Sequence, residues 1–418
     1  MFYSRFTVRF FFLLTVSCIS IAKAAYYTPA NGSCWSTKVF PKPNFPQYRS
    51  WYPKYSDLYM DISKTACNET LDLYREAFYA TADSVKHHKL LCRCVQHQRC
   101  VLETLDLDII ANLQSATVLL GIMPTLLANL GPSIAEISLL STYRPLLSFL
   151  LSIGAPAVWP TRVFQYNDPA IILAPVDPDN HPKLVIGMVT SENLSFAISA
   201  AQYLLATGAI ANVIYTSIDL GEKTILSWGC TTTFLPLVWI GAASVIHVIA
   251  ATSYAVTRRK VRNKTVDGGD NVQRIQECPG SASHSPLDRR TVRNLVPEIC
   301  RVITKETTIC ANQDKKAYDS TTVPKGTMAL NVFAGCLSFV HLVFGTVVFS
   351  SIQFVSVWDV LNQILWRYIL STVICRLLLI MEFAGLRNGT INVPSRDDDS
   401  LGSNTPEVES YPIDNCTN

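Results

Sequence analysis

The apolar stretch ILSWGCTTTFLPLVWIGAASVIHVIAATSYAV (residues 225–256) and the basic run RRKVRNK (residues 258–264) behind it decide how this chain folds. The apolar stretch exceeds the roughly 20 residues that a helix needs to cross a hydrocarbon layer about 30 Å thick. The run behind it holds five basic residues in seven. Because positive residues next to a span stay in the cytoplasm, we expect residues 225–256 to cross a membrane toward its cytoplasmic side.

Four further stretches are long and apolar enough to span a membrane, and they cover residues 109–131, 194–218, 328–355 and 357–386. The whole chain is 49% hydrophobic and only 16% charged, against about 25% charged residues in soluble domains. Its net charge of +3 is too small to indicate nucleic-acid binding. The composition predicts an all-α polytopic membrane protein.

A sixth stretch, residues 133–159, is interrupted by Glu136, Arg144 and Pro145. Its uninterrupted part is too short to span and suits a re-entrant or interfacial segment. Glu136 and Arg144 lie about 80° apart on a helix and could share an edge that faces lipid headgroups, or form a buried pair in a re-entrant hairpin. If this segment enters the membrane and returns on the same side, the chain crosses three times before the basic run. Three crossings take a chain that starts in the lumen to the cytoplasm, where the basic run is expected. We therefore predict five transmembrane helices plus a possible re-entrant segment.

The first 24 residues have the features of a secretory signal peptide. Arg5 and Arg9 supply the positive start, an apolar core follows, and Ala22-Lys23-Ala24 matches the small-x-small cleavage pattern. A retained anchor helix is the alternative, although the apolar core is short for a span. Either way, the residues that follow are delivered to the lumen.

This threading divides the chain into successive parts. We expect a lumenal or extracellular domain over residues 25–108, a first membrane block over 109–256 and a second over 327–386. A cytoplasmic loop then covers 160–193, a larger basic cytoplasmic loop covers 257–326, and an acidic tail covers 387–418. The composition of the larger loop favours a solvated linker, although residues 292–309 could hold a short helix, and the composition of the tail is typical of a disordered segment.

The N-terminal domain is predicted to be small and stapled by disulfides, because a core of this size is marginal alone and its compartment is oxidising. Its proline-rich start predicts irregular structure, and residues 69–105 predict a helical run. The candidate disulfide cysteines are Cys34, Cys67, Cys92, Cys94, Cys100 and Cys230. Five lie in the domain, and an odd number cannot all pair there. Cys230, near the lumenal end of the third span, is the candidate sixth; the alternative is a small apolar residue in helix packing.

Two other features belong to this domain. Asn31 and Asn68 each begin an Asn-x-Ser/Thr sequence and are candidate glycosylation sites. His87, His88 and His97 lie among the cysteines and allow a zinc site as an alternative, but the spacing Cys-x-Cys-x5-Cys is not typical of zinc. We therefore predict no metal site.

Several motifs resemble a family of multi-pass membrane proteins from filamentous ascomycete fungi. They are Cys34-Trp35-Ser36, the stretch WYPKYSD (residues 51–57), the stretch SATVLLGIMPT (residues 115–125), and Ala135-Glu136 followed by RPLL (residues 144–147). The resemblance covers residues 34–260. That family is uncharacterised, so the resemblance implies a fungal origin and a membrane location but no activity.

Polar residues inside the spans are the remaining clue to chemistry, because burying them in a membrane is costly. The candidates are His247, His341, Asp359, Asn362, Gln363 and Arg367. The last four fall on one face of an ideal helix. They could form a polar seam that binds a solute or relays protons, or merely bond between helices and snorkel to the interface.

No phosphate loop, metal-binding helix motif, nucleophile elbow or dinucleotide turn is present in the sequence. We therefore predict no catalytic residues and no cofactor, and do not expect an enzyme. The preferred function is a membrane sensor or scaffold that links the N-terminal domain to cytoplasmic loops, in the plasma membrane rather than internal membranes. The alternatives are a transporter or channel, and a membrane enzyme without a recognisable motif. The expected partner is the bilayer, with anionic lipid headgroups contacting Arg258, Arg259, Lys260, Arg262 and Lys264.

Overall fold

Five helices in the described part of the chain are long and apolar enough to cross a membrane. The computed structural model describes residues 46–79, 84–159, 192–230, 232–267, 306–310 and 325–388. The candidate spans are Leu107–Leu130, Asn193–Lys223, Leu235–Ala255, Gly326–Ser350 and Val357–Leu386. The prediction of five spanning helices is thus confirmed by length and composition.

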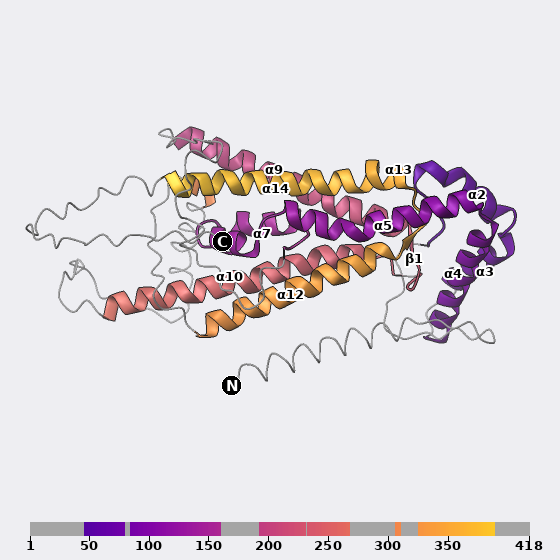
Figure 1. Cartoon of the computed structure of the whole chain (residues 1–418), viewed down its shortest axis with the longest axis horizontal. Helices are drawn as coiled ribbons and strands as arrows, with labels where there is room; N and C mark the ends of the chain where they lie inside the picture. The colour runs from indigo at the N-terminus through magenta and orange to yellow at the C-terminus, as the bar shows by residue number, and fades with distance from the viewer. Residues whose placement is uncertain are drawn as a thin grey trace, which may run out of the picture.

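These spans form one elongated bundle (Figure 1). The first four are α5 (Leu107–Leu130), α9 (Glu192–Lys223), α10 (Leu235–Asp267) and α12 (Lys325–Ser350). The fifth joins α13 (Val357–Asp359), the π-helix η3 (Val360–Leu365) and α14 (Trp366–Asn388) into one continuous rod. Figure 1 shows successive spans running in alternating directions along the bundle. Five alternating crossings leave the start of α5 and the end of α14 at opposite ends.

A small helical unit caps one end of the bundle. This N-terminal unit consists of η1 (Pro53–Tyr55), α2 (Ser56–Lys64), α3 (Asn68–Tyr79) and α4 (Ser84–Thr104). We call the end that it covers the cysteine end and the opposite one the loop end (Figure 1). The predicted single helical run over 69–105 is two helices, α3 and α4, that pack against each other. The proline-rich start, predicted to be irregular, ends in the 3-10 turn η1, and helix α2 follows it from Ser56.

Residues 133–159 form a helical hairpin rather than a span. Helix α6 (Ile134–Ser141) runs into α7 (Pro145–Gly154), and a parallel bridge joins Ser133 to Trp159 at the two ends of the hairpin. Ser133 and Glu136 form a capping box at the start of α6. Helices of 8 and 10 residues reach only about 12 and 15 Å. The segment therefore goes out and returns, which is the path expected of a re-entrant segment.

Two predicted span boundaries are wrong, because the chain forms a short sheet where helix was expected. Strand β1 (Ile225–Leu226) pairs antiparallel with β2 (Ile352–Gln353) at the cysteine end. The third span therefore begins at Leu235, with Pro236 in the first turn, where its missing N–H costs nothing. The fourth span ends at Ser350. Both predicted spans were too long because the residues of β1 and β2 are mostly apolar, like those of a span. Their backbone groups nevertheless bond across the sheet.

The core of the N-terminal unit continues into the bundle without a break. Tyr48, Trp51 and Tyr59 share one buried apolar cluster with Ile225 of β1 and with Phe354, which follows β2. The Trp51 and Phe354 rings lie 5.1 Å apart, and the Tyr59 and Phe354 rings 5.5 Å apart. Aromatic pairs at such distances add to the stability from burial alone. The N-terminal unit and the bundle thus share one packed core at the cysteine end.

Candidate functional site

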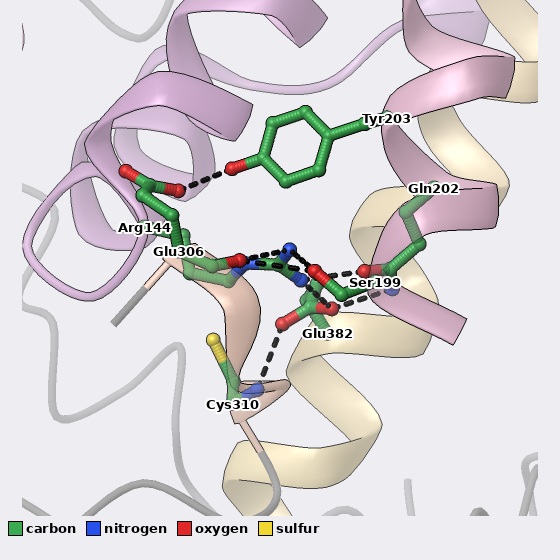
Figure 2. A network of polar contacts seen from close by, with 7 residues as sticks. All are labelled: Arg144, Ser199, Gln202, Tyr203, Glu306, Cys310 and Glu382. Carbon is green, nitrogen blue, oxygen red and sulfur yellow. Dashed lines mark hydrogen bonds and ion pairs between the residues drawn. The ribbon is translucent and has the colours of Figure 1, made fainter. Parts of the chain in front are cut away.

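Seven polar residues from four parts of the chain meet in a buried cluster at the loop end (Figure 2). We call this group the loop-end cluster, and its members are Arg144, Ser199, Gln202, Tyr203, Glu306, Cys310 and Glu382. The side chains of Arg144 and Glu382 are 0% and 1% exposed, and Arg144 Nη1 lies 2.7 Å from Glu382 Oε1. The Gln202 side chain bonds to both of them. A buried ion pair needs such additional hydrogen bonds to offset its desolvation.

The local sequence explains why Arg144 enters the bundle. Pro145 follows it, and a residue before proline is pushed out of helical geometry; Arg144 has φ −131° and ψ 79°. Pro145 occupies the first position of α7, where proline is favoured. Arg144 thus stands at the tip of the α6–α7 hairpin and directs its guanidinium toward α9 and α14 (Figure 2).

The loop-end cluster also holds a short segment of the loop that follows α10. Arg144 Nη2 and Ser199 Oγ donate to the Glu306 carbonyl oxygen at 2.8 and 3.0 Å. The Glu306 carboxylate accepts from the Leu146 N–H at 2.7 Å and from the Tyr203 hydroxyl. The Cys310 N–H donates to Glu382 Oε2 at 3.0 Å. Both ends of segment 306–310 are thereby fixed to the bundle.

The single positive charge in the cluster balances only part of its negative charge. Arg144 carries one positive charge, whereas Glu306 and Glu382 supply two carboxylates. Burial, and then the nearby Glu382 carboxylate, raise the pKa of the Cys310 thiol well above its usual range. The Cys310 thiol is consequently neutral and unreactive while the segment stays docked.

Sequence reasoning missed most of this cluster. Loop 257–326 was predicted to be solvated, but Glu306, Ile309 and Cys310 are buried. Arg144 does not face headgroups, and it does not share an edge with Glu136, which pairs with Arg376 instead. The sequence did hold one signal of the cluster, the Glu382 carboxylate near the end of the apolar stretch 357–386. A charged residue in a span usually has a partner in the bundle.

A second polar site lies at the cysteine end, where disulfides join the N-terminal unit to the bundle. Cys67 pairs with Cys100 inside the unit, with Cα atoms 5.9 Å apart. Cys94 of α4 pairs with Cys230, which precedes α10, with Cα atoms 6.0 Å apart. This geometry matches the hypothesis of a tether through Cys230, whose side chain is also buried in the apolar cluster of the N-terminal unit.

The other predicted residues of the N-terminal unit are accounted for as follows. Cys92 is disulfide-bonded as well. With Cys92, Cys94 and Cys100 all oxidised, no thiolate is left for the alternative zinc site. His97 Nδ1 bonds instead to the Thr70 hydroxyl at 2.8 Å. Asn68 is exposed at the start of α3, as a glycan acceptor must be.

Two further contacts fasten the unit to strand β2 and to the fifth span. The Lys54 N–H donates to Asp359 Oδ2 at 3.3 Å, and the Ser356 hydroxyl donates to the same oxygen at 2.8 Å. The Gln98 side chain bonds to the Gln353 side chain of β2. Asp359, predicted as part of an intramembrane seam, is therefore a buried anchor for the N-terminal unit.

The predicted polar seam along the fifth span does not form. Asn362 is exposed and bonds back to the Trp358 carbonyl of its own helix. Gln363 and Arg367 are half-buried, and the Arg367 guanidinium lies 5.3 Å from the centre of the Tyr215 ring. Residues 360–365 form a π-helix, in which each turn holds more residues than in an α-helix. The assumed rotation of 100° per residue therefore fails in this stretch.

The two predicted histidines of the spans are buried near the middle of the bundle. The His341 ring stacks on Trp239 at 5.2 Å, and its Nε2 bonds to the Pro156 carbonyl at 3.0 Å. His247 is buried, and neither ring nitrogen has a hydrogen-bond partner in the part of the chain that the structure describes. His341 thus ties α12 to the end of the α6–α7 hairpin.

Some predicted features lie outside the described residues. They are the signal peptide 1–24, Cys34, Asn31, the tail from 389 to 418, most of loop 257–326, and the side chains of His87, His88, Arg258, Arg259, Lys260, Arg262 and Lys264. The backbone at those basic positions continues helix α10 past the last apolar residue of the span.

The chain matches no protein-family model, no curated protein and no solved structure in the three comparisons made. The resemblance of residues 34–260 to a fungal membrane family stays an expectation from the sequence. The chemistry of the two ends therefore has to be argued from the residues themselves.

Proposed function

We propose that this protein is a membrane sensor or scaffold, in which the fifth span links the N-terminal unit outside the cytoplasm to loop segment 306–310 inside it. The observation that carries the proposal is that one helical rod contacts both. At the cysteine end Asp359 accepts from the Lys54 N–H. At the loop end Glu382 accepts from the Cys310 N–H and pairs with Arg144.

The fifth span transmits a displacement from one end to the other because the close-packed bundle around it cannot deform continuously. Protein interiors are close-packed, and Tyr368, Cys375 and Leu379 of α14 are fully buried among neighbouring spans. A shift of Asp359 therefore moves the helix as a body and changes the position of Glu382. The two carboxylates are the points at which each end of the rod is held.

The proposed orientation rests on charge and redox chemistry. Five basic residues follow the third span on its loop-end side, and such residues mark the cytoplasm. The disulfides lie at the cysteine end, and disulfides persist in the lumen or outside the cell. The basic run also supports the proposed contact with anionic lipid, and the signal peptide predicted from the sequence supports a place in the secretory pathway or plasma membrane.

Labelling of Cys310 tests the link along the fifth span. The variant Asp359→Ala removes the anchor of the N-terminal unit, and we expect the Cys310 thiol to react at least about fivefold faster with a thiol reagent. Peptide mapping by mass spectrometry assigns the label to Cys310. The matched control is Asp72→Ala, because Asp72 is an exposed carboxylate of the same unit. Unchanged labelling in Asp359→Ala, in protein with the Cys94–Cys230 bond intact, contradicts the proposal.

A further inference from the structure

The manner in which segment 306–310 is held resembles the recognition of a peptide more than the packing of a loop. Its bonds in the cluster run to the Arg144 side chain, to the backbone of α7 and to side chains of α9 and α14. They involve a side-chain carboxylate, a backbone carbonyl and a backbone N–H. These three kinds of group are present in any acidic peptide.

The carboxylate of Glu306 sits where a helix start and a hydroxyl both donate to it. Leu146 is the second residue of α7, and free N–H groups in the first turn of a helix bind anions. Tyr203 adds its hydroxyl from α9. Charge-assisted bonds to a carboxylate are roughly twice as strong as neutral ones, so Glu306 is the specificity-determining residue of the segment.

The apolar anchor lies at the other end of the segment. Ile309 is 4% exposed and Cys310 is fully buried. Thr307 and Thr308, between the two anchors, are half-buried. The segment is therefore held at its start by the Glu306 carboxylate and at its end by a buried apolar side chain and the Cys310 N–H, which reaches Glu382.

The bundle side of this site is held together without the segment. Arg144 pairs with Glu382, and Gln202 bonds to both; these residues lie at the start of α7, on α14 and on α9. These bonds persist if segment 306–310 leaves, and water can replace the bonds to Glu306 and Cys310. The site is thus preorganised, which lowers the cost of binding a peptide.

We propose that residues Arg144, Leu146, Ser199, Tyr203 and Glu382 form a docking site for acidic peptides, with segment 306–310 as the resident occupant that an acidic segment of a cytoplasmic partner protein replaces. This deepens the proposed function, because the site is the loop end of the same fifth span. Binding to the site nevertheless needs no signal from the N-terminal unit, so the two ideas fail separately.

The test uses the full chain in detergent and a fluorescent peptide with the sequence of residues 303–313 carrying Cys310→Ser. In the protein, Glu306→Ala releases the resident segment. We expect the peptide to bind this variant at least tenfold more tightly than the wild type, whose site is filled. A peptide with Glu306→Gln should bind the variant at least tenfold more weakly than the peptide that keeps the Glu306 carboxylate.

Paired variants on helix α9 give the control. In the Glu306→Ala background, Tyr203→Phe removes one donor to the carboxylate and should weaken the peptide severalfold. Tyr215→Phe lies on the same helix but is exposed outside the site, and it should leave binding unchanged. If Glu306→Ala does not survive purification, Ile309→Ser releases the segment at its apolar anchor and takes its place.

Three outcomes overturn the docking site. In the first, the peptide does not bind a released variant that keeps its disulfides and a wild-type thermal midpoint. In the second, the peptide binds the wild type as tightly as it binds the released variant. In the third, Tyr203→Phe and Tyr215→Phe change peptide binding equally. Any of them would leave the segment as a structural strap only. The Cys310 labelling experiment on Asp359→Ala reads transmission along the fifth span and stays valid in each case.

Discussion

Gly345 of α12 sets the distance between two spans. A Cβ built at this position meets Trp239 Nε1 at 2.3 Å, Trp239 Cε2 at 2.9 Å and Pro124 Cγ at 3.1 Å. Trp239 is fully buried, and its Nε1 donates to the His341 carbonyl at 3.3 Å. The indole therefore occupies the space that glycine leaves open, and α10 and α12 approach closely only because position 345 has no side chain.

The variant Gly345→Ala is accordingly expected to destabilise the bundle by about 1–3 kcal/mol, the usual cost of overpacking a dense core. Its effect is measured as a lower thermal midpoint in detergent. Gly241→Ala on α10 is the matched control, because a Cβ there meets nothing within 4 Å, and it should be neutral or slightly stabilising. Equal midpoints for the two variants would show that Trp239 can move away at little cost.

His97 makes the stability of the N-terminal unit depend on pH. Burial, and then the nearby Arg75, lower the pKa of His97 to about 4, whereas an unfolded histidine titrates near 6.5. Between these values the unfolded chain binds the proton and the folded unit does not, so stability is present above pH 6.5 and falls as the pH drops. At pH 4 the loss reaches about 3 kcal/mol.

Thermal midpoints measured from pH 7 to pH 4 should therefore decline, with most of the decline below pH 6.5. In His97→Asn the amide can still bond to the Thr70 hydroxyl but does not titrate, so the decline should become shallower. A wild-type slope in that variant would assign the pH dependence to carboxylates elsewhere.

At the scale of elements, the π-helix η3 corrects the rotation of the fifth span. A single inserted residue is the usual origin of such a π-bulge. Before it, Asp359 must face the N-terminal unit; after it, Glu382 must face Arg144. The bulge lets both carboxylates point inward from one rod.

Deleting one residue inside the bulge should therefore be tolerated. Asn362 is exposed, and its removal is expected to convert η3 to ordinary α-helix while the Asp359 and Glu382 contacts survive. Removal of Leu370, which is also exposed but lies in regular α-helix, rotates all later residues by about 100°. That deletion should break the Arg144 pair and expose Cys310 to thiol reagents. Equal Cys310 labelling in the two deletions would disprove the role given to the bulge.

At the scale of the whole molecule, glycan acceptors report which end faces the lumen. Asn68 at the cysteine end should carry a glycan in the expressed protein, whereas Asn263, in the basic run of α10, should not. The measurement is the shift in gel mobility after glycosidase treatment of Asn68→Gln and Asn263→Gln variants. A glycan on Asn263 would reverse the orientation proposed for all five spans.

The sequence was sufficient for features that depend on composition and insufficient for those that depend on distant contacts. Length and hydropathy predicted the five spans, and interruptions by Glu136, Arg144 and Pro145 predicted that residues 133–159 do not cross. Helix ends at Leu235 and Ser350 were missed, because apolar strands and spans look alike over a few residues. Glu306 was missed because its partners lie more than 100 residues away.

The disulfide between Cys94 and Cys230 can form only late in the synthesis of the chain. The two cysteines are separated by 136 residues, so at about 5–20 residues per second the ribosome makes Cys230 roughly 7 to 27 s after Cys94. Cys67 and Cys100, only 33 residues apart, are complete long before. Throughout that interval Cys94 has to escape capture by its nearer neighbours. The N-terminal unit can therefore be locked onto the bundle only after the second span has been synthesised.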